Sequence, residues 1–217
     1  IINHQSSIIN NQSSIIITEH STQNQKATIR KETMVTFTLT PTNANEIPRN
    51  VVHLIVAEGF TEIPDNLCYR RYRQGIDSLE TVVFSKSVTV IGSRAFCYCT
   101  NLKSVMFPND SQLREIGDEA FHGCESLLSI DIPDSVTTIG DFAFYECTNL
   151  ESVLFTDQSC LQEIEGDAFN GCHSLQSIVI PNSVIEIGRS AFAECSNLKS
   201  VIFAEHSSIQ TINCWTF

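Results

Sequence analysis

Apolar residues recur at matched positions through residues 91–217, in units of alternating length. The units begin at six isoleucines, with steps of 25, 23, 25, 23 and 25 residues: Ile91, Ile116, Ile139, Ile164, Ile187 and Ile212. The first five units carry Ala-Phe at the fourth and fifth positions after the isoleucine, Cys at the eighth and Leu at the eleventh. A fixed period of roughly 20–30 residues with this many matched positions predicts a solenoid.

Each unit predicts one strand and one turn region. The strand has the pattern Leu-x-Ser-Val/Ile-x-Phe/Ile, in which alternate side chains enter the core. Three of the strands are followed directly by proline, which cannot donate to a sheet ladder. In the turn region, Ala95, Phe96 and Cys99 have the spacing of one helix face. We therefore expect one or two helical turns in every unit.

The strand pattern continues towards the N-terminus. It predicts seven parallel strands, centred on Leu54, Val82, Val105, Ile130, Val153, Ile178 and Val201. Residues 51–217 form the predicted solenoid, with an incomplete last unit. Residues 34–50 predict a separate alternating strand followed by a turn. Residues 1–33, rich in Asn, Gln, Ser and Ile and without helix signals, predict a disordered leader.

The repeat has a resemblance to a known family. The stretches IGDEAFHGCESLLSIDIPDSVTTIG and IGDFAFYECTNLESV resemble the BspA-type leucine-rich repeat of bacterial surface antigens, and the resemblance covers residues 51–217. It implies an α/β solenoid of 23- and 25-residue units, with short parallel strands on one face and short helical turns and loops on the other. It also implies protein recognition, often in cell-surface adhesion, and no catalysis.

Five of the nine cysteines stand at the same position of successive units: Cys99, Cys124, Cys147, Cys172 and Cys195. We predict a structural ladder of buried free thiols, because parallel side chains on stacked coils fit the disulfide dihedral angle poorly. Cys68, Cys97 and Cys160 are the predicted exposed thiols. Cys97-x-Cys99 lacks a second Cys/His pair at ligand spacing, and the histidines form no column. No metal site, cofactor or catalytic residue is therefore predicted.

Charge narrows the range of partners. Acidic residues outnumber basic ones 25 to 13, which argues against nucleic acid or an anionic membrane as the main partner. No apolar run reaches the length of a transmembrane helix. The sequence leaves the compartment open: the resemblance implies a surface or secreted protein, whereas free thiols and the lack of a signal-peptide pattern favour an intracellular one.

Three surfaces are candidates for binding a protein partner. The first is the outward centre of the predicted sheet, where six of seven positions are apolar: Ile55, Val83, Met106, Asp131, Leu154, Val179 and Ile202. The second is a contact loop at Tyr69, Arg70, Arg71, Tyr72 and Arg73. The third is residues 115–188, which hold fourteen acids and no Lys or Arg and would attract a basic partner. The alternatives are strand propensity with lateral packing for the first, an ordinary surface loop for the second and a solvated face that keeps the protein soluble for the third; the sequence favours binding only at the first.

The sequence therefore predicts a protein-interaction module that binds through the strand face and its flanking loops. The alternative is a structural spacer or self-assembling scaffold. It would associate through the C-terminal end, where the last unit stops at Phe217 and leaves core positions uncovered.

Overall fold

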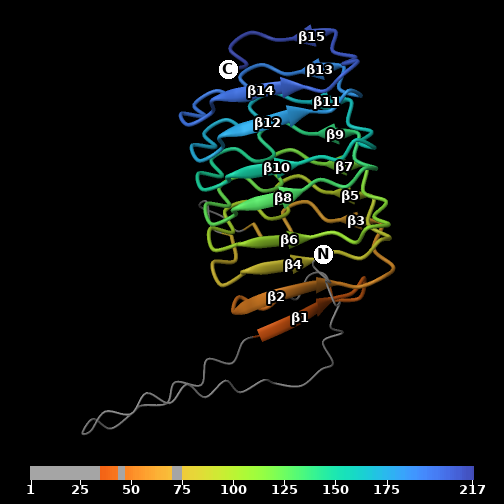
Figure 1. Ribbon diagram of the computed structural model, residues 1–217. Helices are drawn as coiled ribbons and strands as arrows, with labels where there is room; N and C mark the ends of the chain where they lie inside the picture. The colour runs from red at the N-terminus through yellow and green to blue at the C-terminus, as the bar shows by residue number, and fades with distance from the viewer. Residues whose placement is uncertain (1–34, 44–46, 70–74) are drawn as a thin grey trace, which may run out of the picture. The chain divides into compact units, whose positions relative to one another are not determined.

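The computed structural model describes residues 35–43, 47–69 and 75–217. The predicted leader and residues 70–74, which include Arg70, Arg71, Tyr72 and Arg73, lie outside the described residues. Residues 35–217 form one compact unit, and this unit is a stack of coils with strands on two walls (Figure 1).

One wall, here called the front column, consists of the longer strands. They are β1 (Val35–Leu39), β2 (Val51–Val56), β4 (Thr81–Val83), β6 (Ser104–Met106), β8 (Ser129–Asp131), β10 (Ser152–Leu154), β12 (Ser177–Ile180) and β14 (Ser200–Phe203). All of their pairings are parallel, as the repeat predicts for the seven strands from β2 to β14. β1, expected as a separate strand, also pairs in parallel with β2. Alternation places one residue of each short strand in the core and its neighbours outside, as in Ser129–Asp131, where only Ile130 is buried.

The opposite wall, here called the back column, is a ladder of two-residue strands that the sequence did not reveal. It runs through β3 (Glu62–Ile63), β5 (Val90–Ile91), β7 (Glu115–Ile116), β9 (Thr138–Ile139), β11 (Glu163–Ile164), β13 (Glu186–Ile187) and β15 (Thr211–Ile212). Hydrogen bonding continues through all seven strands. The isoleucine that begins each unit is the inward residue of its strand and is buried in every coil except the last.

The front column is divided into blocks, whereas the back column is continuous. The hydrogen-bonded groups of the front column are β1-β2-β4-β6, β8-β10 and β12-β14. Coils whose strands are 23 residues apart pair, as in β8 and β10. Strands that are 25 residues apart, such as β6 and β8, lie side by side without a ladder (Figure 1). The two additional residues fall in the loop that follows β6 or β10, so the ladder stops beside the longer loop.

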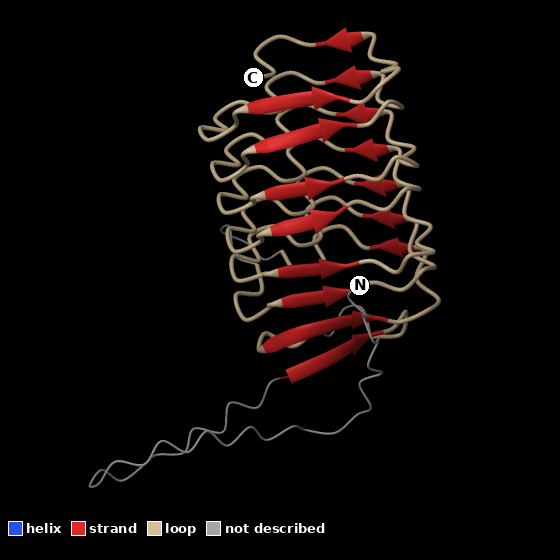
Figure 2. Ribbon diagram, viewed as in Figure 1, coloured by secondary structure: helices blue, strands red, loops and turns tan. Residues whose placement is uncertain are grey.

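The expected helical turns are absent: the part of the chain that the structure describes contains strands and turns but no helix (Figure 2). Arg94 and Tyr98 have φ angles of 58° and 56°, which interrupt any right-handed helix. Between them, the N–H groups of Ala95 and Cys97 donate three residues back, while the N–H of Phe96 donates to Ala120 of the next coil. Consecutive β-turns therefore produce the same burial of Ala, Phe and Cys that a helix turn would produce.

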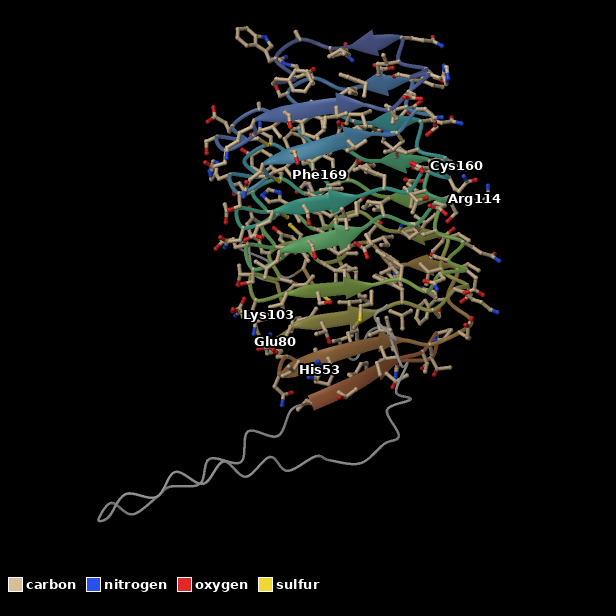
Figure 3. All side chains as sticks on the ribbon, viewed as in Figure 1. His53, Glu80, Lys103, Arg114, Cys160 and Phe169 are labelled. Atoms are coloured by element: carbon tan, nitrogen blue, oxygen red, sulfur yellow. The ribbon has the colours of Figure 1, made fainter. Side chains whose placement is uncertain are left out.

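The core between the two columns is organised around a stack of five phenylalanine rings. Phe96, Phe121, Phe144, Phe169 and Phe192 are all buried, and neighbouring rings lie parallel with centroids 5.1–5.4 Å apart. Phe169 lies inside the stack of coils in Figure 3. Because each ring contacts the equivalent ring of the next coil, the core grows by one identical layer per unit.

Candidate functional site

The outward residues of the front column line up across neighbouring strands. Register pairs Ile55 with Val83, Val83 with Met106, Asp131 with Leu154, and Val179 with Ile202. Met106, Leu154, Val179 and Ile202 are 46–54% exposed, whereas Ile55 and Val83 are half-buried. We call these seven residues the front stripe. Its exposed apolar part therefore lies on β6, β10, β12 and β14, with Asp131 between them.

The predicted contact loop can be followed only at its first residue. Tyr69 is half-buried, and its ring centroid is 6.3 Å from that of Tyr98 in the following coil. Cys68, immediately before it, is buried and donates its N–H to the carbonyl of Ala95. Cys68 thus occupies the place in its coil that Phe96 occupies in the next, so the prediction that it is exposed is wrong.

The five repeated cysteines are free thiols inside the core. Four of them donate to the carbonyl oxygen of the phenylalanine in the preceding coil, at Sγ–O distances of 3.1–3.3 Å: Cys124, Cys147, Cys172 and Cys195. Burial raises the pKa of the Cys147 thiol to about 12 and that of Cys195 to about 11. The four donating thiols are therefore protonated and join successive coils.

Acidic side chains on the turn side also join successive coils. The N–H of Asp141 is 3.1 Å from Asp118 Oδ1 and 3.1 Å from Glu165 Oε2, and the N–H of Gly166 donates to Asp141 Oδ1 at 2.7 Å. Burial, together with the charges of Asp141 and Asp118, raises the pKa of the Glu165 carboxyl. These acids therefore have a structural role, in addition to giving the turn side of the coils its negative charge.

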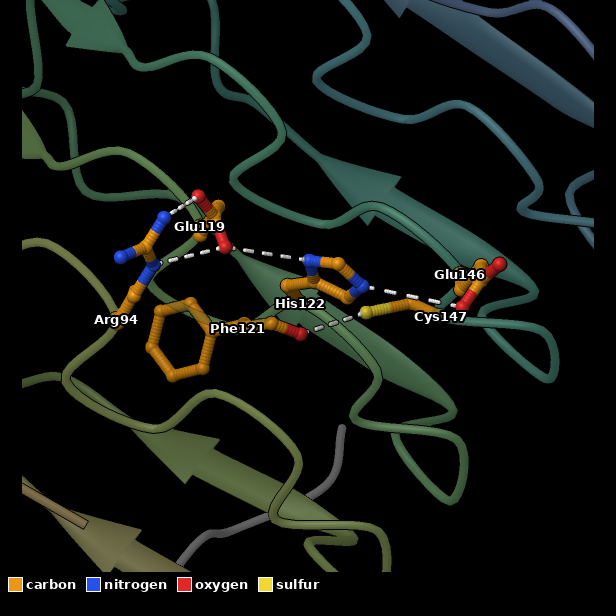
Figure 4. A network of polar contacts seen from close by, with 6 residues as sticks. All are labelled: Arg94, Glu119, Phe121, His122, Glu146 and Cys147. Atoms are coloured by element: carbon orange, nitrogen blue, oxygen red, sulfur yellow. Dashed lines mark hydrogen bonds and ion pairs between the residues drawn. The ribbon is translucent and has the colours of Figure 1, made fainter. Parts of the chain in front are cut away.

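A network of charged and aromatic side chains surrounds His122, also on the turn side of the coils (Figure 4). Arg94 binds both carboxylate oxygens of Glu119, and this pairing lowers the pKa of Glu119. Glu119 Oε2 lies 3.6 Å from His122 Nδ1, and Glu146 Oε2 lies 3.8 Å from Nε2. The imidazole is therefore approached by one carboxylate at each nitrogen.

The His122 ring is held between two tyrosines. Its centroid is 4.8 Å from that of Tyr98 and 4.9 Å from that of Tyr145. Gly123, with a φ of 69°, makes room for Tyr98: a Cβ at this position would lie 2.7 Å from the tyrosine ring. The ring plane of His122 is consequently fixed by packing on both sides.

Cys97 also belongs to the cluster around His122. It was expected to be exposed, but it is fully buried, and burial raises its pKa to about 12. Its Sγ, a Glu119 oxygen and a His122 nitrogen all lie within 4.8 Å of one another. Cys97 and His122 are both the sixth residue after their unit's isoleucine. Comparing residues at the same position of successive units, rather than short spacings along the chain, would have paired Cys97 with His122.

The C-terminal coil exposes several apolar side chains. Trp215 is 73% exposed and Phe217 is 60% exposed, and the stack of rings ends with Phe217 at 5.9 Å from Phe192. Cys214 in this coil and Cys160 in the loop before β11 are the two exposed thiols among the nine cysteines. Figure 3 shows Cys160 at the outer edge of the back column. No described helix is long and apolar enough to cross a membrane.

The coil geometry, the parallel front column and the repeated Leu, Phe and Cys layers define a leucine-rich-repeat solenoid. The chain belongs to the BspA-type leucine-rich repeat family, whose model matches residues 61–199 and 155–217 in six copies. Proteins of this class generally act in protein interaction and typically have no enzymatic activity.

Solved bacterial structures show the same architecture. A leucine-rich repeat protein of T. pallidum is 31% identical, over 70% of this chain and 69% of that one, with a TM-score of 0.62. A protein of Eubacterium ventriosum is 25% identical with a TM-score of 0.57, over 76% of this chain and 44% of that one. The pneumococcal vaccine antigen PcpA, at 24% identity and a TM-score of 0.66, shares the fold over 73% of this chain and 42% of its own length. The search of curated proteins gave no match.

Proposed function

We propose that the solenoid is a recognition module that binds a protein partner across the front stripe. The observation that carries this proposal is the alignment of Met106, Leu154, Val179 and Ile202 at one register position, each about half exposed. Strands in such a column are about 4.8 Å apart, so the directly paired Val179 and Ile202 form one apolar patch with Leu154 on the neighbouring strand, and Asp131 separates Leu154 from Met106. Burying the exposed half of each would contribute about 1 kcal/mol per side chain.

The surroundings of the stripe favour a partner with a basic rim. Asp131 lies within it, and Glu151 is exposed just before β10. The strands from β2 to β14 span six gaps of about 4.8 Å, and most have three or four residues of about 3.3 Å each, so the face is roughly 300–400 Å², less than the roughly 800 Å² that each partner buries in a standard interface. Flanking loops must therefore contribute, and in the central coils these loops are acidic and contain no Lys or Arg between residues 115 and 188. Adhesion at a cell surface is the biological setting in which such a face is most readily useful.

A display experiment tests this proposal without knowledge of the natural partner. Peptides are selected from a random phage library on the wild-type protein and then titrated against two variants. Val179→Asp places a charge in the stripe, as Asp131 does naturally at the same position of an earlier unit. Phe142→Glu places a charge on the turn side, where Glu119 stands in the preceding unit.

Most selected peptides are expected to bind Val179→Asp at least tenfold more weakly and Phe142→Glu with unchanged affinity. A peptide set that binds Val179→Asp normally would refute the front stripe as the main recognition surface. Matching thermal unfolding of both variants with the wild type would show that neither substitution disturbs the fold.

The scaffold alternative has one observation in its favour, the exposed Ile212, Trp215 and Phe217 of the last coil. If this end associates with a second copy, sedimentation velocity will show dimers that increase with concentration and disappear in Trp215→Ser. A single 24.2 kDa species at all concentrations would exclude self-association of this chain.

A further inference from the structure

Cys97, Glu119 and His122 bring three different metal-ligating groups to one point between two adjacent coils. Cys97 and His122 stand at the same position of successive units, and Glu119 precedes His122 by three residues on the same turn. One ligand atom of each lies within 4.8 Å of the other two. We propose that these residues form a binding site for a zinc-class divalent transition-metal ion.

The donor set selects the class of ion. A cysteine sulfur, an imidazole nitrogen and a carboxylate oxygen are ligands that zinc takes from proteins, whereas calcium and magnesium take oxygen alone. Zinc binding would displace the proton of the Cys97 thiol to water, so the site should bind more tightly as pH rises. Zinc–ligand bonds of about 2.0–2.3 Å place neighbouring ligand atoms about 3.3–3.8 Å apart in a tetrahedron. Contraction by about 1 Å would convert the observed cluster into three-ligand coordination with a fourth position for water, and because the tyrosines fix the His122 ring, this contraction would have to come from the Cys97 and Glu119 side chains.

Glu146 and the two tyrosines lie where groups that orient a metal-bound histidine are found. Histidines that bind metal through one nitrogen usually donate the other N–H to a carboxylate. With the ion at Nδ1, the proton lies on Nε2 and faces Glu146 Oε2, 3.8 Å away. Tyr98 and Tyr145 hold the ring in this orientation, with centroids 4.8 and 4.9 Å from that of His122.

The contact between Glu119 and His122 is consistent with a cation on this side. Glu119 Oε2 is an acceptor only, and it lies 3.6 Å from Nδ1. A proton on Nδ1 faces this carboxylate favourably, and an ion bound at Nδ1 would take the place of that proton beside the same carboxylate. Arg94 also binds Glu119, so the ion must share one carboxylate with a guanidinium. This sharing weakens the site but leaves the ligand set intact.

The experiment starts from a Cys160→Ser, Cys214→Ser protein, in which both exposed thiols are removed. Calorimetric titration of this reduced protein with zinc chloride is expected to show one equivalent bound. Titration with cobalt chloride is expected to produce thiolate-to-cobalt charge-transfer absorption, which requires a cysteine ligand. Neither signal depends on a partner or on the proposed recognition function.

Two variants test the Cys97 and His122 ligands. Cys97→Ala copies Ala193, the residue at this position of a later unit, and His122→Phe keeps an aromatic ring between the tyrosines. Each is expected to weaken zinc binding more than 100-fold and to remove the cobalt signal, while Glu146→Gln weakens binding about 10- to 100-fold. His173→Ala, a histidine outside the cluster, should bind normally.

Two outcomes would overturn the proposal. One is the absence of stoichiometric zinc binding in the starting protein. The other is zinc binding that persists in Cys97→Ala and His122→Phe, because the ion would then be held by other residues. Circular dichroism and thermal unfolding of the metal-free variants distinguish loss of a ligand from loss of the fold.

Discussion

Removing one ring from the middle of the phenylalanine stack should destabilise the solenoid far more than removing the ring at its end. Phe169 is fully buried between Phe144 and Phe192, with centroid distances of 5.1 and 5.4 Å. Replacing a buried phenylalanine by alanine costs about 3–5 kcal/mol, because the transfer free energy is lost and a cavity remains. Phe217 has one ring neighbour at 5.9 Å and is 60% exposed, so Phe217→Ala should cost about 1 kcal/mol.

Urea unfolding followed by far-UV circular dichroism measures both variants. With a slope of about 2 kcal/mol per molar urea, the expected midpoint shifts are about 1.5–2.5 M for Phe169→Ala and about 0.5 M for Phe217→Ala. Trp215, the single tryptophan, reports separately on the last coil. Equal shifts for the two variants would refute the reasoning, because they would mean that the stacked core does not carry more stability than the exposed end.

Two further predictions concern titrating groups. In a thiol assay without reductant, two cysteines, Cys160 and Cys214, should react quickly in the native protein and all nine after denaturation; more than two fast thiols, or fewer than nine in total, would contradict the buried free ladder. The raised pKa of Glu165 means that its favourable contribution is complete below the unfolded pKa of about 4.3 and is lost as pH rises through the folded pKa. Glu165→Gln keeps an acceptor for the Asp141 N–H, so it should stabilise the protein slightly at about pH 7 and not at about pH 4; an equal gain at both values, measured by urea midpoints, would contradict this explanation.

The repeat pattern predicted the front column because strand residues, core residues and unit length all repeat together. It did not predict the turn geometry. Burial at Ala95, Phe96 and Cys99 suits a helix turn and a run of β-turns equally, and the choice depends on whether Phe96 donates its N–H within its coil or to the next. Most of the left-handed residues that decide this, such as Arg94, Tyr98 and Phe142, are of types that do not favour positive φ.

The His122 cluster was missed for a related reason. Metal motifs are usually searched by short spacing along one chain segment, whereas a solenoid brings together residues one full unit apart. Cys97 and His122 are 25 residues apart in sequence and adjacent in the stack. The additional contact with Glu119 depends on its own left-handed backbone, with a φ of 54°, which no sequence pattern reveals.

The interrupted front column has a mechanical consequence. We expect the continuous back ladder to act as a spine that carries three front plates: one of four strands, β1-β2-β4-β6, and two of two strands, β8-β10 and β12-β14. The two smaller plates are 48 residues apart, a 23-residue and a 25-residue step together. Bending of the spine would open or close the seams between plates while each plate stays rigid. The pairs Asp131–Leu154 and Val179–Ile202 lie on different plates, so bending at the seam between them would change the curvature of the front stripe without breaking a front-column pairing.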